Sequence, residues 1–202
     1  MKKEKLIIRY AKPADFDTLA KFRIEQFLSS NEFVVKTPEK LANVAGKVLI
    51  AENESGIIST MQFEIMPSHE FFRDYSNANF LSEPRTDIYP SYYLSKAGTS
   101  KEYRNTGINS ILRIIIIQQA IAESSILSLT GCGYENGPRL NLLKRLGYDF
   151  SEIKLSETAY TVPNGKFFFL CLERQKLQSA LEKLEEETKE LKANFDLEFQ
   201  LQ

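Results

Sequence analysis

The sequence is poor in the residue types that build metal centres and disulfide frameworks. It has no tryptophan, one histidine (His69) and two cysteines (Cys132 and Cys171) among 202 residues. The cysteines lie in apolar stretches without the spacing of metal ligands, and one histidine does not complete a zinc cluster. We therefore expect no metal ion, and we expect both thiols to be buried and reduced.

The sequence also lacks a dominant charge and a long apolar run. Lys and Arg number 26 against 27 Asp and Glu, giving a net charge of −1, so no broad basic field favours nucleic acid as a partner. No apolar run reaches the length of a membrane span, and the charged start, Met1 to Lys5, lacks the core of a signal peptide. We expect a cytoplasmic protein that binds small molecules or other proteins and no membrane.

Hydrophobic patterns predict strands and helices that alternate along the chain. Runs rich in β-formers and bounded by turn residues predict the strands, and apolar residues at helical spacing predict the helices. The predicted strands cover 6–10, 47–52, 56–66, 92–99, 126–130 and 166–173, and the predicted helices cover about 15–28, 38–44, 110–122 and ten residues after Asn136. This order predicts an α/β sandwich around one mixed sheet.

The most informative segment is the turn between the strand at 92–99 and the helix at 110–122. Its core reads Arg104-Asn105-Thr106-Gly107-Ile108-Asn109. The first N–H groups of a helix have no internal partner, and the helix dipole adds partial positive charge there, which favours a phosphate. Gly107 lets the backbone approach such a group, and Arg104 and Lys101 add cations. The segment therefore predicts a phosphate or pyrophosphate site.

Together with a second segment, this turn resembles the motifs of the GNAT superfamily of acyl-CoA N-acyltransferases. The family's donor motif is Gln or Arg, two free positions, Gly, one free position, then Gly or Ala. Arg104 and Gly107 match it, whereas Asn109 stands where the family has a small residue. The second segment runs from Asn136 through a helix to Leu-Gly-Tyr ending at Tyr148, at the spacing of the family's β5–α4 segment.

The resemblance covers most of 6–172 and implies a GNAT-like mixed central sheet flanked by helices. It implies a domain at 1–172 with an insertion at about 67–91, followed by an added helix and tail at 173–202. It further implies an enzyme that moves an acetyl or longer acyl group from CoA to a primary amine of a small molecule, amino acid or peptide. Acetyl-CoA or another acyl-CoA would be bound by Ala97, Gly98, Thr99, Arg104, Asn105, Thr106, Gly107, Ile108, Asn109 and Asn136.

The catalytic groups are less clear from the sequence. Transfer needs an oxyanion donor, an acid for the leaving thiolate and a neutral amine. The family supplies the oxyanion contact from the backbone, here at 97–99. It often places a Tyr that acts as the general acid seven residues after the Asn, where this chain has Leu143. Tyr134 or Tyr148 could replace that Tyr, and Tyr134 is better placed. Glu64 is the candidate base, with His69 and Glu70 as alternatives.

Two other functions stay open. The insertion, about 67–91, is rich in Phe and Tyr and forms either the wall of an acceptor pocket or acyl tunnel, or a helical cover over the sheet. With Asn109, it gives a softer resemblance to N-acyl amino acid synthases that take the acyl group from acyl carrier protein. Leu143 and Asn109 also suit a non-catalytic module that binds CoA or a nucleotide as a sensor.

The C-terminal segment shows leucines at heptad spacing among Glu and Lys. The apolar seam comprises Leu177, Leu181, Leu184, Thr188 and Leu191. Such a helix either docks on its own domain or pairs with a second copy in a homodimer.

Overall fold

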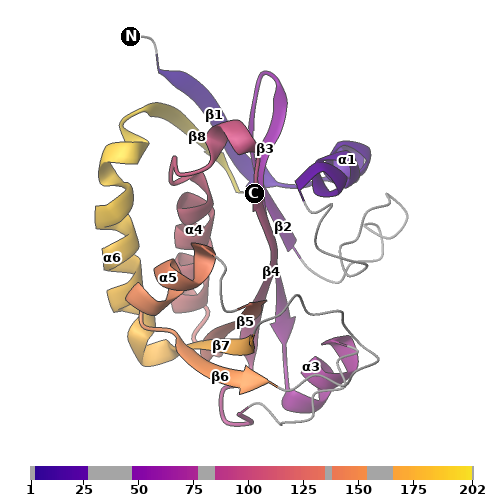
Figure 1. Cartoon of the computed structure of the whole chain (residues 1–202), viewed down its shortest axis with the longest axis vertical. Helices are drawn as coiled ribbons and strands as arrows, with labels where there is room; N and C mark the ends of the chain where they lie inside the picture. The colour runs from indigo at the N-terminus through magenta and orange to yellow at the C-terminus, as the bar shows by residue number, and fades with distance from the viewer. Residues whose placement is uncertain (1–2, 27–46, 77–84, 135–137, 154–165, 202) are drawn as a thin grey trace. The chain divides into compact units, whose positions relative to one another are not determined.

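The computed structural model describes residues 3–26, 47–76, 85–134, 138–153 and 166–201. The predicted helix at 38–44 lies outside these ranges. The elements, in chain order, are β1 (Glu4–Tyr10), η1 (Pro13–Asp15), α1 (Phe16–Gln26), β2 (Lys47–Asn53), β3 (Gly56–Met66), α3 (His69–Ser76), β4 (Ser91–Thr99), η2 (Lys101–Tyr103), α4 (Ile108–Ala122), β5 (Ser128–Tyr134), α5 (Pro138–Arg145), β6 (Asp149–Ile153), β7 (Phe167–Glu173), α6 (Arg174–Lys192) and β8 (Phe195–Gln200) (Figure 1).

The strands form one mixed sheet, in the order β6-β7-β5-β4-β3-β2-β1-β8. β2 pairs antiparallel with β1 and β3, β4 pairs parallel with β5, and β7 pairs antiparallel with β5 and β6. This arrangement confirms the predicted α/β class and the mixed sheet. Strand β6 was not predicted, and β5 extends four residues beyond its predicted end at 130, so Tyr134 is its last residue.

Residue contacts divide the chain into two compact units. Unit 1 comprises Met1–Glu64, Ser95–Ile116 and Leu184–Gln202, and unit 2 comprises Ile65–Leu94 and Ile117–Lys183. The predicted donor turn and Glu64 belong to unit 1, whereas the insertion and Tyr134 belong to unit 2.

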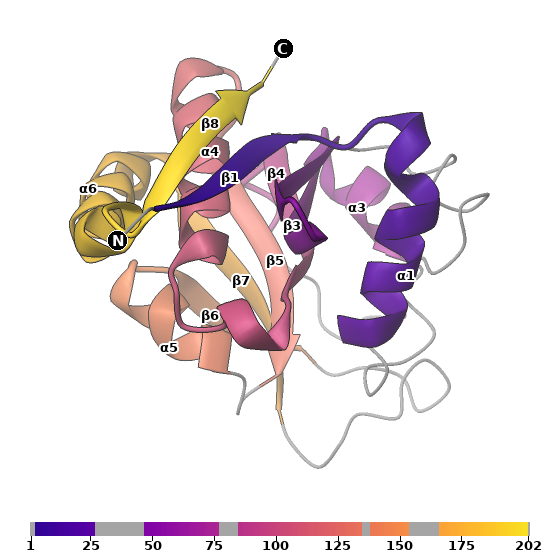
Figure 2. The ribbon, with the colours of Figure 1, turned by 90° about the horizontal axis from the view of Figure 1, so that it is seen from above.

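In unit 1, α1 packs on one face of the sheet. Leu19 and Ala20 of α1 form a buried cluster with Val48 and Ile50 of β2. Val48 is paired with Gln62 across the β2–β3 ladder, so Gln62 points to the same face as α1. Asn109 at the start of α4 bonds instead to the side chain of Ser59, which alternation directs to the other face. Figure 2 shows α1 and α4 on opposite sides of β1 and β3.

The C-terminal segment contains a strand that was not predicted. β8 pairs in parallel with β1, with Leu197 opposite Leu6, and Figure 2 shows the two strands side by side. The heptad residues of α6 whose side chains are described are all buried within the single chain, namely Leu177, Leu181, Leu184 and Thr188. A homodimer through α6 stays a prediction, and it would have to use a face other than this seam.

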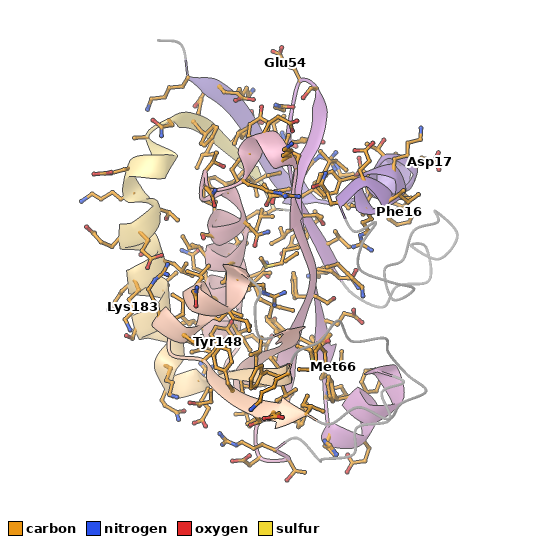
Figure 3. The ribbon with its side chains drawn as sticks, viewed as in Figure 1. Phe16, Asp17, Glu54, Met66, Tyr148 and Lys183 are labelled. Atoms are coloured by element: carbon orange, nitrogen blue, oxygen red, sulfur yellow. The ribbon has the colours of Figure 1, made fainter. Side chains whose placement is uncertain are left out.

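In unit 2, the first helix of the insertion covers the sheet. Phe72 of α3 is fully buried, and its ring lies 5.4 Å from that of Tyr93 and 5.5 Å from that of Phe169. Met66, labelled near the end of β3 in Figure 3, belongs to the same apolar cluster. Residues 69–76 thus form a helix that covers the sheet, in agreement with one of the two interpretations of the insertion. None of the helices in the described ranges is long and apolar enough to cross a membrane.

Candidate functional site

The turn predicted to bind the donor has a well-defined backbone. After η2, Asn105 and Gly107 both adopt the left-handed region, with φ of 65° and 77°. Glycine accepts this conformation without steric cost, and Asn is among the few other residues that tolerate it. Between them, the Thr106 hydroxyl donates a 2.6 Å hydrogen bond to the Tyr103 carbonyl. These features end β4 and lead the chain directly into α4, which begins at Ile108.

The turn is anchored to the paired strands β1 and β2 by a compact polar triangle. The Tyr103 hydroxyl donates to Glu4 Oε1 at 2.6 Å, and Asn53 Nδ2 donates to both groups, at 2.8 and 2.7 Å. The bond to the Glu4 carboxylate raises the pKa of Tyr103, because it favours the protonated phenol. The turn is therefore held from its N-terminal side by two strands.

The start of α4 presents donors suited to an anion. The Gly107 carbonyl accepts the first bond of the helix, from the Ile111 N–H at 3.0 Å, so the amides of residues 108–110 precede the intrahelical ladder. Arg104 is exposed, and its Nε and Nη2 make only long contacts, 3.3 Å to the Thr99 carbonyl and 3.4 Å to Gln26 Oε1. The guanidinium thus lies at the turn and can pair with phosphate oxygens.

Asn109, the departure from the family motif, bonds inward to β3. Its Nδ2 lies 3.4 Å from Ser59 Oγ and 3.4 Å from the Thr60 carbonyl. Ser59 Oγ in turn lies 2.9 Å from Thr99 Oγ1 and donates to the Gly98 carbonyl at 3.0 Å. The Asn109 side chain therefore links α4 to β3 and the end of β4, and does not fill the turn.

A second polar group in unit 1 lies on the α1 face of the sheet. Arg23 Nη2 donates to Gln62 Oε1 at 2.9 Å, and Gln62 Nε2 donates to Glu64 Oε1 at 2.7 Å. Their exposed fractions are 0% for Arg23, 1% for Gln62 and 4% for Glu64. Buried polar groups of this kind are costly unless hydrogen-bonded, so the chain from α1 along β3 fixes all three side chains.

Lys96 on β4 faces this group. It is half-buried and has a φ of 50°, and a left-handed residue inside a strand is typical of a bulge. Burial and the charge of Arg23 lower the pKa of Lys96 to about 8, although Glu64 acts in the opposite direction. Lys96 immediately precedes residues 97–99, from which the family resemblance draws the backbone oxyanion contact.

The predicted site residues are thus partly brought together. Unit 1 contains Glu64, the strand end at 97–99 and the turn at 104–109. Tyr134 ends β5, but its side chain and the whole of Asn136 lie outside what the structure describes. In unit 2, Leu143 is fully buried and Tyr148 is 7% exposed.

Sequence reasoning missed Arg23, Gln62 and Lys96. A signal existed for two of them. Arg23 follows Leu19 by four residues, so it lies on the buried stripe of α1, and Gln62 alternates with apolar residues along β3. No pattern in the sequence indicates the setting of Lys96, because it depends on the local backbone conformation.

Burial raises the pKa of Cys132 to about 12 and that of Cys171 to about 11, so both stay protonated at neutral pH. Within the described ranges, no three His, Cys, Asp or Glu side chains are grouped to hold a metal ion.

Comparison with solved structures shows the fold. The CoA-dependent acyl-homoserine lactone synthase BjaI, with MTA, matches with a TM-score of 0.62 and 11% identity over 98% of this chain and 93% of its own. NAA60 of Arabidopsis thaliana, with a bisubstrate analogue, matches with a TM-score of 0.59 and 14% identity over 84% of this chain and 98% of its own. The putative acetyltransferase yncA of Salmonella typhimurium, with acetyl-CoA, matches with a TM-score of 0.58 and 15% identity over 83% of this chain and 93% of its own.

No protein-family model matches the chain, and no curated protein matches it in sequence. Identities this low establish the fold alone. The chain has the fold of the GNAT acyltransferases, as its two sequence segments predicted.

Proposed function

We propose that the protein is an N-acyltransferase that moves an acetyl or longer acyl group from CoA to a primary amine. The observation that carries this proposal is the anchored turn at 104–109, in which Arg104 and Gly107 stand at the opening of α4 in a GNAT fold. The acetyl-CoA in the Salmonella structure supports the same donor class. Asn109 is compatible with it because its side chain is directed to β3.

The chemistry follows from the elements of unit 1. The pyrophosphate would lie against the first amides of α4 and Arg104, and the pantetheine arm would run along the end of β4. There, backbone amides at 97–99 would stabilise the oxyanion as the amine attacks the thioester. Groups that donate to developing charge, rather than to the ground-state carbonyl, account for the largest share of catalysis in such sites.

A longer acyl chain or a carrier-protein donor is the second candidate. The match to the acyl-homoserine lactone synthase extends over 98% of this chain and so includes its C-terminal segment. Because that synthase is CoA-dependent, the match supports the longer acyl chain and does not support a carrier-protein donor. The insertion also contributes Phe72 to an aromatic cluster in unit 2. A sensor that binds CoA without turnover is the remaining alternative.

Thermal denaturation with acetyl-CoA, CoA or a long-chain acyl-CoA tests donor binding. A ligand at 100 times its dissociation constant adds about 2.7 kcal/mol of stability, which gives a clear shift in Tm. Arg104→Glu should abolish that shift, whereas Lys189→Glu, the same charge reversal at an exposed position on α6, should retain it. Absence of a shift with any CoA compound in the wild type would contradict the CoA donor.

Thiol release in the presence of candidate amines then tests transfer. Amine-dependent release of CoA is expected for the enzyme. Binding without release for every amine would favour the sensor, and release from acyl carrier protein alone would favour the synthase.

A further inference from the structure

Lys96 is an unusual residue for the middle of a sheet. Burying an ammonium is costly unless it is paired. Among the residues that the structure describes, Lys96 Nζ has no hydrogen-bond or ion-pair partner, although its side chain is half-buried. The residue also adopts a φ of 50°, which side chains other than Gly, Asn and Asp seldom do. A buried unpaired ammonium and a strained backbone at the same residue suggest that Lys96 has a functional role.

The left-handed backbone at Lys96 affects where its side chain points. Side chains alternate between the two faces of a regular strand, and a left-handed residue interrupts that alternation. The charged groups that face Lys96 are Arg23 from α1 and Glu64 from β3. Both belong to the hydrogen-bonded chain on the α1 face, so the amine lies on that face, one residue before Ala97.

Glu64 is poorly placed to be the base that the sequence suggested. It is 4% exposed, and its Oε1 already accepts a hydrogen bond from Gln62. Arg23 stands at the other end of the same hydrogen-bonded chain. Because its carboxylate is held in this buried chain, Glu64 is suited to positioning Lys96.

We propose that Lys96 carries the proton during acyl transfer, as the base that neutralises the acceptor amine and then as the acid that protonates the leaving thiolate. This inference rests on the proposed N-acyltransferase function. It also explains how the thiolate can be protonated in a chain that has Leu143 where the family often has a tyrosine acting as the general acid.

The proton balance is complete without a further reactant. The neutral Lys96 amine takes one proton from the acceptor ammonium, and the freed lone pair attacks the thioester carbon. The C–N bond forms and the C–S bond breaks, and the Lys96 ammonium gives its proton to the departing sulfur. The second proton of the attacking nitrogen leaves to water. The net products are an amide, the free thiol and one proton.

The charge environment matches both half-reactions. A pKa of about 8 leaves a sizeable neutral fraction at neutral pH, and it lies close to the ordinary value of about 8.5 for a thiol. Proton transfer is most effective when the catalytic pKa is near the working pH. The turnover rate should therefore rise with pH up to about 8, because only the neutral amine of Lys96 accepts a proton.

Lys96→Arg tests the role, because arginine keeps the charge and does not deprotonate. We expect kcat to fall about 10²- to 10⁴-fold while the KM for the acyl-CoA and the donor-induced Tm shift stay at wild-type values. Lys96→Met should lose a similar factor, and both losses should shrink at high pH, where the acceptor enters already neutral. The matched control is Lys21→Met, an exposed lysine of α1, which should retain wild-type kcat.

An NMR titration of ¹³C-labelled lysines checks the same residue without turnover. The resonance that disappears in Lys96→Arg should titrate near pH 8 in the wild type. Full activity in Lys96→Arg, or titration at the ordinary lysine value, would overturn the inference. A wild type that transfers to no amine, with or without a donor shift, marks failure of the proposed function itself, whereas a wild type that turns over and keeps full activity in Lys96→Arg marks failure of this inference alone.

Discussion

Arg23 of α1 and Gln62 of β3 are joined by a 2.9 Å hydrogen bond between side chains that are almost completely inaccessible to solvent. The bond crosses from the helix to the sheet and continues through Gln62 to Glu64. A buried polar chain of this kind is strongly coupled, because removing one member leaves its neighbour without a partner in a medium of low dielectric constant.

Arg23→Met should therefore destabilise unit 1 even though it introduces an apolar side chain. The variant leaves Gln62 Oε1 buried without its donor, and we expect the free energy of unfolding to fall by about 1 to 3 kcal/mol. Urea denaturation measures the change. Lys21→Met, two residues away on the exposed side of α1, serves as control. Equal stability of the Arg23 variant and the wild type would show that the chain is structurally unimportant.

Lys96→Met should have the opposite effect on stability at neutral pH. The pKa of Lys96 is lowered from 10.5 to about 8 in the folded protein, so the folded state binds fewer protons than the unfolded chain between these values. The cost of the buried charge is thus fully present below pH 8 and disappears above about pH 10.5. The variant lacks this cost, and at pH 7 it should be more stable by roughly 1 to 3 kcal/mol, since one pKa unit corresponds to about 1.4 kcal/mol.

Denaturation of both proteins at pH 7 and pH 10 tests this prediction. The advantage of Lys96→Met should be largest at pH 7 and small at pH 10. A variant less stable than the wild type at pH 7 would indicate that the Lys96 stem contributes packing that outweighs its charge. Greater stability combined with lost turnover would be the usual trade-off at a functional site.

The sequence predicted those features that depend on neighbouring residues. The turn at 104–109 could be recognised because its requirements are local: a glycine at positive φ, a cation beside it and a helix that follows at once. The strands of the β2–β3 hairpin were found for the same reason. A helix was predicted at 110–122 although this segment contains four successive isoleucines, which are strong β-formers, and α4 confirms the helix.

The features that were missed depend on distant parts of the chain. β8 pairs with β1, at the other end of the sequence. Its alternating Phe-Asp-Leu-Glu-Phe-Gln was a local strand signal that the prediction overlooked. The group formed by Arg23, Gln62 and Lys96 draws its members from three elements, and no spacing along the chain reveals it. Polar residues within patterns that otherwise predict burial were the available signal, and Arg23 on the buried stripe of α1 was the strongest instance.

Asp15 links acid stability to the start of α1. The two carboxylate oxygens of Asp15 accept hydrogen bonds from Arg9, at 2.7 and 2.8 Å, and Arg9 also pairs with Glu52. The Arg9 hydrogen bonds lower the pKa of Asp15 below its usual 3.8, so its contribution is present above that value and is lost as pH falls through the lower folded value. Asp15→Asn should cost about 1 to 2 kcal/mol at pH 7 and almost nothing near pH 2.

Asp17→Asn is the matched control for this change. Asp17 lies exposed on α1, as Figure 3 shows, and carries the same charge two residues away. Its substitution should alter stability little at either pH. A constant difference between Asp15→Asn and the wild type from pH 7 to pH 2 would mean that the carboxylate charge is not what Arg9 recognises.

Arg174, the first residue of α6, closes the C-terminal end of α4. Its Nη1 donates to the carbonyls of Ala120, Glu123 and Ile126, at 3.1, 3.1 and 2.8 Å, and its Nη2 donates to that of Ile121 at 3.1 Å. The last carbonyls of a helix have no partner within it, and the helix dipole makes a cation favourable there. One guanidinium therefore binds two of the last carbonyls of α4 and two carbonyls just beyond its end, of which that of Glu123 also accepts the Ile126 N–H.

Arg174→Met should lower the free energy of unfolding by about 2 to 4 kcal/mol, because several charge-assisted hydrogen bonds are lost together. Arg174→Lys should recover only part of this, since an ammonium lacks the planar fork that reaches both sides of the helix end. Lys189→Met, an exposed change on the same helix α6, should stay within about 0.5 kcal/mol of the wild type. If Arg174→Lys were as stable as the wild type, the charge alone would be sufficient and the fork geometry would not matter.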